Sequence, residues 1–344
     1  AQTGRPGPCW LDIPLNVQGA TVETDELEGF DPSKENLTAI PSVTNEQVDA
    51  IIEKIRQAKR PVLNAGNGIR IAGAFDVFRR VAEKLGIPVV TGWNSIDLME
   101  DEHPLYTGRA GNMGDRAGNF AVQNSDLLFS VGSRLSIRQV NYDWPAWAKH
   151  AFVIMNDIDA EELKKPSLHV EMPVWADAKD LLEKLESRLN EKLADGEVLF
   201  KGDEWRQVCE KWKKDYPVVQ PKHYEQKSPA NVYAFIKEES RRLNEGQITV
   251  VGNGSACVVG GHGYVIKKGQ RFISNSAIAS LGYDLPAAIG ACVANKRYCK
   301  ETGEKEQDII CVTGDGSIQL NLQELQTIIH HQYPTQIFLI HNGG

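Results

Sequence analysis

The sequence lacks any long hydrophobic run and any closely spaced pair of cysteines. No stretch of about eighteen consecutive apolar residues occurs in the 344-residue chain, so no segment is predicted to span a membrane. Its first residues do not form the basic and apolar pattern of a signal peptide. The six cysteines are scattered without a C-x-x-C pair, which predicts free thiols and a cytoplasmic location rather than a disulfide framework.

An excess of basic charge is also missing. The chain has 38 Lys and Arg against 46 Asp and Glu, for a formal net charge of −8 at pH 7. Binding to nucleic acid depends on Lys and Arg that neutralise phosphates, and no basic stripe is present. The composition therefore argues against a nucleic-acid partner, while 41% hydrophobic residues are enough for globular cores.

Apolar strands and amphipathic helices alternate along the chain, and its length suits two domains. Such alternation predicts the α/β class, with two doubly wound and mainly parallel sheets. Strands are predicted at residues 9–13, 61–65, 87–91, 126–131, 152–156, 170–175, 247–251, 271–274, 308–313 and 337–340. Thr44, with Gln47 three residues later, predicts a capping box at the start of a helix.

The segment between the two predicted domains is rich in charge. Residues 199–227 are predicted to form a helix that leads into a linker, which puts the domains at residues 1–198 and 228–344. Ser228-Pro229 is expected to cap the first helix of the second domain. Residues 295–307 are mostly charged and predict a solvated surface loop.

Two motifs in the first domain are each compatible with two interpretations. Gly66-Asn67-Gly68 follows a strand, which fits either a nucleotide site or a tight turn between a strand and a helix. Asp157-Ile158-Asp159 follows another strand, where an acid can hold a ribose hydroxyl or cap a helix.

The end of the chain predicts a βαβ unit. A β-branched strand over residues 308–313 runs into Gly314-Asp315-Gly316-Ser317, and a helix and the strand over residues 337–340 follow. Because parallel strands end at the same edge of a sheet, we expect Asp315 and Asn342 to lie side by side. Carboxylate and amide oxygens are hard ligands that Mg²⁺ accepts, although Gly-Asp-Gly alone is also an ordinary turn signal.

This Gly-Asp-Gly-Ser loop, followed by an Asn after the next strand, resembles the cofactor motif of thiamine-diphosphate-dependent enzymes. The resemblance implies that Asp315, Asn342 and the backbone carbonyl of Gly344 hold Mg²⁺, which anchors the diphosphate. It also implies that Gly316 and Ser317 belong to the cofactor-binding loop. The family usually has two Asn after the second strand, whereas this chain has His341-Asn342 and keeps only the metal-binding one.

Residues 277–291 resemble the family segment Gly-x-Met-Gly-x-x-Leu-Pro-Ala-Ala-Ile-Gly-Ala. Leu281 stands where the family has the bulky residue that bends the cofactor, and the carbonyl of Ala279 would accept the aminopyrimidine N–H. The residues that match the family's diphosphate-binding turn are Gly254, Ser255 and Ala256. Acetolactate synthases commonly have Gln-His at the last two of these positions.

The first domain is similar to the central domain of the acetolactate synthase group. The similarity rests on Gly4-Arg5-Pro6-Gly7-Pro8, Leu11-Asp12-Ile13-Pro14, His103-Pro104-Leu105-Tyr106, Asn119-Phe120-Ala121-Val122, Gly132-Ser133-Arg134 and Asp157-Ile158-Asp159 with Glu162. In that group the domain binds FAD without using its redox chemistry, while relatives with the same fold bind ADP or nothing. The family's Arg-Phe-Asp-Asp-Arg is replaced here by Arg-Leu-Ser-Ile-Arg at residues 134–138, so these three alternatives stay open.

The resemblance as a whole implies an acetolactate-synthase-like enzyme, a homodimer or homotetramer, that decarboxylates a 2-oxo acid and transfers the two-carbon unit to an acceptor. The alternatives are a related thiamine-diphosphate decarboxylase or lyase, and a non-catalytic nucleotide- or metal-binding α/β protein. In the family, the glutamate that activates the cofactor comes from a preceding domain of the partner subunit. The chain is therefore expected to be a fragment that lacks this domain and the C-terminal end, and to be inactive alone.

Overall fold

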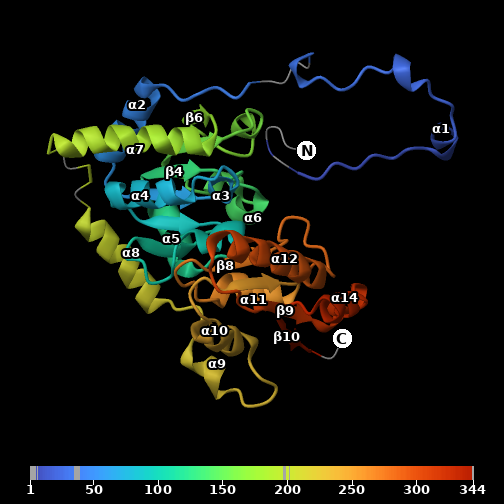
Figure 1. The fold of residues 1–344 in the computed structure, drawn as a ribbon. Coiled ribbons are helices and arrows are strands. Elements are labelled where there is room, and N and C mark those ends of the chain that lie inside the picture. The colour runs from blue at the N-terminus through green and yellow to red at the C-terminus, as the bar shows by residue number, and fades with distance from the viewer. Residues whose placement is uncertain (1–4, 6, 35–38, 197–198, 201, 343–344) are drawn as a thin grey trace.

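The computed structural model describes residues 5–342, except residues 6, 35–38, 197–198 and 201. Two parallel sheets, each packed against helices, form the body of the molecule (Figure 1). The predicted α/β class with two doubly wound sheets is confirmed. Within these described residues, no helix is long and apolar enough to cross a membrane.

The first sheet has six parallel strands in the order β3-β2-β1-β4-β5-β6. They are β1 (Pro61–Ala65), β2 (Val89–Thr91), β3 (Tyr106–Arg109), β4 (Leu127–Val131), β5 (Phe152–Asp157) and β6 (Met172–Trp175). The helices of this part are α1 (Leu15–Gln18), α2 (Asn45–Gln57), α3 (Gly68–Ile71), α4 (Phe75–Leu85), α5 (Arg116–Asn124), α6 (Ile137–Val140), α7 (Ala178–Ala194) and α8 (Asp203–Asp215), with short 3₁₀ turns η1 (Thr24–Glu26), η2 (Pro32–Lys34), η3 (Trp93–Leu98), η4 (Trp144–Ala146) and η5 (Glu162–Lys164). Every residue of β1 and β4 is buried, as is typical of central strands in a parallel sheet.

The start of α2 shows how local sequence sets an element. The N–H of Gln47 donates to the Thr44 hydroxyl at 3.2 Å, and the Gln47 side chain accepts from the N–H of Thr44 at 3.0 Å. This is the predicted capping box, which satisfies two N–H groups that the helix itself leaves without partners. The buried face of the helix carries Val48, Ile51, Ile52 and Ile55.

The order of the first sheet reverses between β1 and β4, which is where sheets of this kind bind ligands. The turns after these two strands pack directly on each other. The N–H of Gly68 donates to the Gly132 carbonyl at 2.9 Å, and a Cβ at Gly66 would lie only 2.2 Å from that oxygen. The close packing of the two turns explains why Gly66 and Gly68 must be glycines. This agrees with the tight-turn interpretation.

The second sheet has four parallel strands in the order β10-β9-β7-β8. They are β7 (Ile248–Val251), β8 (Arg271–Ser274), β9 (Ile309–Gly314) and β10 (Thr335–Ile340). The helices of this part are α9 (Pro221–Glu225), α10 (Val232–Arg242), α11 (Ser255–Gly263), α12 (Asp284–Thr302), α13 (Asp315–Leu320) and α14 (Glu324–His331). The predicted βαβ crossover is confirmed, since β9 and β10 are adjacent and parallel with Gly314 opposite Ile340.

Several predicted boundaries are wrong. Residues 9–13 form no strand, and β3 is instead the edge strand of the first sheet. The cap of α10 is Asn231 rather than Ser228, because its side chain accepts from the N–H groups of Tyr233 and Ala234. α12 continues through Thr302, so most of the predicted loop at 295–307 is an exposed, charged helix end.

Helix α8 (Asp203–Asp215), within the predicted linker at 199–227, packs on the first domain. Helix α8 packs against α5 and β3, and it buries Trp205 and Cys209 in the core of the first domain. The Trp205 indole N–H also donates to the carbonyl of Pro61 at 3.1 Å. An apolar helix face therefore anchors a segment whose high charge suggested a solvated connection.

The two domains share a buried polar interface. Arg109, at the end of β3, is only 5% exposed and donates to the carbonyls of His262 at 3.1 Å and Tyr264 at 2.7 Å. It also pairs with Asp101 at 3.1 Å, and the same carboxylate accepts from the N–H of Ile266 at 2.6 Å. These contacts hold the end of α11 and the segment after it against the first sheet.

Candidate functional site

The carboxyl ends of β9 and β10 bring the two expected metal ligands together. Asp315 follows β9, and one oxygen of its carboxylate accepts the backbone N–H of Asn342 at 3.1 Å. The same oxygen lies 2.8 Å from Nδ1 of His341, while the other accepts the N–H of Gly316 at 2.9 Å. The expectation that Asp315 and Asn342 lie side by side is therefore confirmed.

These contacts keep the Asp315 carboxylate charged. The hydrogen bond from the backbone of Asn342, followed by the contact with His341, lowers the pKa of Asp315 below its ordinary value. Carboxylate and amide oxygens are donors that Mg²⁺ accepts, and Asp315 and Asn342 each carry one of them. Among the described residues, no group of three His, Cys, Asp or Glu is placed to hold a metal ion. Gly344, the third expected ligand, lies outside the described residues.

The turn between β7 and α11 forms a second wall of the site. Gly254 has φ +93°, a conformation that favours glycine, and a Cβ built there would meet nothing within 4 Å. Ser255 begins α11 and is exposed, whereas Ala256 is fully buried, so only the backbone and the Ser255 side chain face outward. An open glycine turn at the start of a helix suits an anion such as a diphosphate.

Residues 276–283, called the wedge loop below, form the third wall. Ala279 adopts a left-handed conformation with φ +61°, and the side chain of Leu281 is 52% exposed. A hollow of about 500 Å³ lies beside Leu281, lined also by Tyr283 and Asn321. The bulky residue expected to bend the cofactor therefore projects into open space at the carboxyl edge of the second sheet.

The first domain contains a larger cavity of about 680 Å³ at the point where its strand order reverses. Its lining runs from the Gly66-Asn67-Gly68 turn through residues 132–139 to Ser276 and Ala277 of the second domain. Its charged lining residues are Arg5, Arg134, Arg138, Asp157 and Asp177. The cavity thus extends from the glycine turns of the first domain to the start of the wedge loop.

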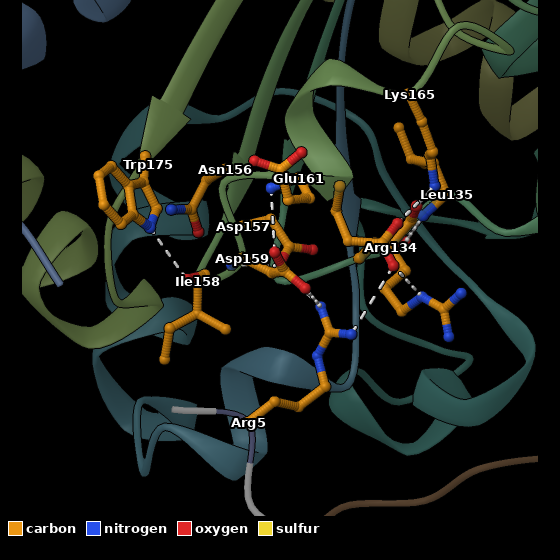
Figure 2. Close-up of polar contacts among 12 residues, drawn as sticks. Arg5, Arg134, Leu135, Asn156, Asp157, Ile158, Asp159, Glu161, Lys165 and Trp175 are labelled. Carbon is orange, nitrogen blue, oxygen red and sulfur yellow. Dashed lines mark hydrogen bonds and ion pairs between the residues drawn. The ribbon is translucent and has the colours of Figure 1, made fainter. Parts of the chain in front are cut away.

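Asp157 ends β5 and is only 4% exposed. Figure 2 shows Arg5 reaching from the N-terminal segment toward it, with a distance of 3.0 Å between the guanidinium and the carboxylate. The carboxylate also accepts the N–H of Asp159 at 2.9 Å, and burial raises its pKa. Asp157 caps no helix, because η5 begins five residues later at Glu162, whereas the Asp159 carboxylate accepts the N–H of Glu161 at 2.9 Å directly before η5.

Three polar residues of the site were not singled out by sequence patterns. Asn253 and Asn321 donate to backbone carbonyls of the wedge loop, at 2.6 Å to Ser280 and 2.7 Å to Gly282. Asp284 is fully buried, and it accepts a hydrogen bond from the hydroxyl of Thr313. Their partners are distant in sequence, so only their closeness to glycine turns could have indicated a role.

Comparison with known proteins agrees with this geometry. Residues 48–185 match the family described as thiamine pyrophosphate enzyme, central domain. Residues 252–344 match the family described as thiamine pyrophosphate enzyme, C-terminal TPP binding domain. Thiamine pyrophosphate is the same compound as thiamine diphosphate, so both matches lie where the sequence resemblance had placed them.

Individual relatives are named as large subunits of acetolactate synthases. The chain is 30% identical over 355 residues to a probable acetolactate synthase large subunit of Methanococcus aeolicus, covering 99% of this chain and 56% of that protein. It is 29% identical to acetolactate synthase isozyme 1 large subunit of Escherichia coli (99% and 56% covered). It is 31% identical to the acetolactate synthase large subunit of Corynebacterium glutamicum (100% and 52% covered). The chain spans about half the length of these relatives. It belongs to the acetolactate-synthase-like thiamine pyrophosphate enzymes, of which it carries the central domain and the TPP-binding domain.

Proposed function

We propose that this chain supplies the cofactor-holding part of an enzyme that decarboxylates a 2-oxo acid and transfers the two-carbon unit to an acceptor. The cofactor would be thiamine diphosphate with Mg²⁺, and its thiazolium ring supplies the chemistry that stabilises the carbanion. The observation that carries the proposal is the contact between Asp315 and Asn342 at one edge of a TPP-binding domain.

Each wall of the site has a distinct role in this proposal. Asp315 and Asn342, with the carbonyl of Gly344, are the proposed Mg²⁺ ligands. The backbone at Gly254, Ser255, Ala256, Gly316 and Ser317 is proposed to surround the diphosphate. Ala279 and Leu281 are proposed to hold the rings, the first by its carbonyl and the second by its bulk in the open hollow.

Calorimetry with thiamine diphosphate and Mg²⁺ tests the proposal. Asp315→Asn should weaken Mg²⁺-dependent binding by at least about tenfold, because the charged metal ligand is lost. Asp308→Asn is the matched control, since Asp308 directly precedes the same strand at its other end and accepts from Gln336 at 2.7 Å. Equal affinity in the Asp315 variant and the wild type would contradict the metal assignment.

We also propose that the cavity of the first domain binds a nucleotide, with FAD as the first candidate and ADP as the alternative. Its volume of about 680 Å³ and its position at the strand reversal support this. Quenching of flavin fluorescence on titration, compared with calorimetry of ADP, distinguishes the candidates. Binding of neither would leave the domain as a structural element only.

The remaining parts of the proposal concern activity and assembly. The hollow beside Leu281 has no carboxylate in its lining, as far as the described residues show. Residues 1–344 alone are proposed to be inactive, because the resemblance assigns the activating glutamate to a preceding domain of the partner subunit; acetolactate formed from pyruvate by this polypeptide would overturn that. The domain limits 1–198 and 228–344, a cytoplasmic location and a homodimer or homotetramer belong to the same proposal. Light scattering after size-exclusion chromatography measures the assembly.

A further inference from the structure

The two large aliphatic side chains of the wedge loop do not hold it in place by burial, although Tyr283 at its end packs against the core of the second domain. Ile278 is 83% exposed and Leu281 is 52% exposed. Ala279 is left-handed, which is unfavourable for a residue with a Cβ. A strained and exposed loop keeps one conformation only where surrounding groups determine it.

Side-chain hydrogen bonds from two neighbouring segments hold the wedge loop in this conformation. The amide of Asn253 donates to the carbonyl of Ser280 at 2.6 Å. At Gly282, the N–H donates to the hydroxyl of Ser317 at 2.8 Å, and the carbonyl accepts from the Asn321 amide at 2.7 Å. Both backbone groups of Gly282, the residue directly after Leu281, are therefore fixed by the segment that follows Asp315.

Close packing at Gly282 makes this arrangement specific. Gly282 has φ +79°, and a Cβ there would lie 2.8 Å from both the Asn321 amide nitrogen and Cβ of Leu320. Ser317 is only 2% exposed, so its hydroxyl is directed to the wedge loop within the protein. The loop and the segment from Asp315 to Asn321 thus pack as one unit.

From these contacts we infer that Asn253, Ser317 and Asn321 are positioning residues. They fix the position of the Leu281 side chain relative to the turn at Gly254 and the loop at Asp315. Asn253 stands next to Gly254 in the proposed diphosphate turn, and Ser317 stands two residues after Asp315. The inference rests on the proposed function. It adds that the wedge loop is physically connected to the loops proposed to hold the diphosphate and the metal. The affinity for thiamine diphosphate should depend on the position of Leu281, because Leu281 is proposed to contact its rings. The affinity for inorganic diphosphate, which has no rings, should not.

That difference defines the test, which compares the calorimetric affinities of thiamine diphosphate and inorganic diphosphate, each with Mg²⁺. Asn321→Ala should weaken thiamine diphosphate binding by about tenfold, as expected for loss of a partly buried hydrogen bond, and change inorganic diphosphate binding by less than about twofold. Gln319→Ala, an exposed change in α13, should alter neither affinity. A general loss of structure would weaken both ligands equally, and that outcome would overturn the inference.

A double-mutant cycle shows whether Asn321 acts through Leu281. Leu281→Ala should reproduce the selective loss of thiamine diphosphate affinity. Because Leu281 is exposed, the substitution removes little core packing, and the variant is expected to fold. In that background, Asn321→Ala should have little further effect, because the positioned side chain is already gone. Fully additive losses would overturn the inference while leaving the proposed function intact. A wild-type protein that binds neither ligand with Mg²⁺ would overturn both.

Discussion

A buried carboxylate in α10 makes the stability of this protein depend on pH. Glu239 is 9% exposed, and neither oxygen of its carboxylate has a hydrogen-bond partner. Burial raises its pKa from 4.5 to about 7. An uncharged carboxyl group is tolerated in such a place far better than an ionised one.

The sign and size of the effect follow from this shift. The folded protein holds the Glu239 proton more tightly than the unfolded chain, so stability should fall as pH rises from 4.5 to about 7. Above about pH 7, the free energy of unfolding stays lowered by the full cost of burying the charged carboxylate. A shift of this size corresponds to about 3 kcal/mol of unfolding free energy. Partial solvation of the group makes this an upper figure.

Replacement Glu239→Gln keeps the shape and removes the charge. We expect the variant to be more stable than wild type by up to about 3 kcal/mol near pH 8, and to be equal to it near pH 4.5. Urea unfolding followed by far-UV circular dichroism at both pH values measures the difference. Glu245→Gln is the matched control, because Glu245 is exposed just beyond the same helix.

The comparison between the two pH values decides the outcome. A gain near pH 8 that persists near pH 4.5 would show that the amide packs better, and the pKa argument would be refuted. A variant no more stable than wild type near pH 8 would show that the carboxylate is solvated or paired in solution. The Glu245→Gln control should follow wild type at both values.

Two further changes test the packing of the fold. Arg109→Ala should destabilise the protein by about 3 kcal/mol or more, because it leaves Asp101 and the carbonyl of Tyr264 without their buried cation. Thermal unfolding measures this, and an unchanged midpoint would contradict the role of Arg109 in joining the domains. Gly66→Ala should lower the free energy of unfolding by more than about 2 kcal/mol, since its Cβ would lie 2.2 Å from the Gly132 carbonyl. Gly290→Ala, within α12 and with open space around it, should instead be neutral or stabilise by up to about 1 kcal/mol in the same assay.

Elements whose cause is local could be predicted well. The capping box at Thr44 and the crossover from β9 to β10 both depend on residues close in sequence, and both are confirmed. Predictions went wrong where long-range packing decided the element. β3 has only four residues and pairs with β2, while α8 is highly charged yet inserts Trp205 into a core.

The sequence by itself determined that Asp315 and Asn342 meet at one edge of the sheet, because parallel strands joined by a helix must end on the same side. Only the tertiary structure decided how the wedge loop is held. The bonds from Asn253 and Asn321 reach it from segments on either side in the chain, and each amide needs a backbone partner at a definite distance and angle. Sequence spacing contains no information about such a meeting, since it arises when separate elements pack on one sheet. The same holds for Arg109, whose carbonyl partners belong to the other domain.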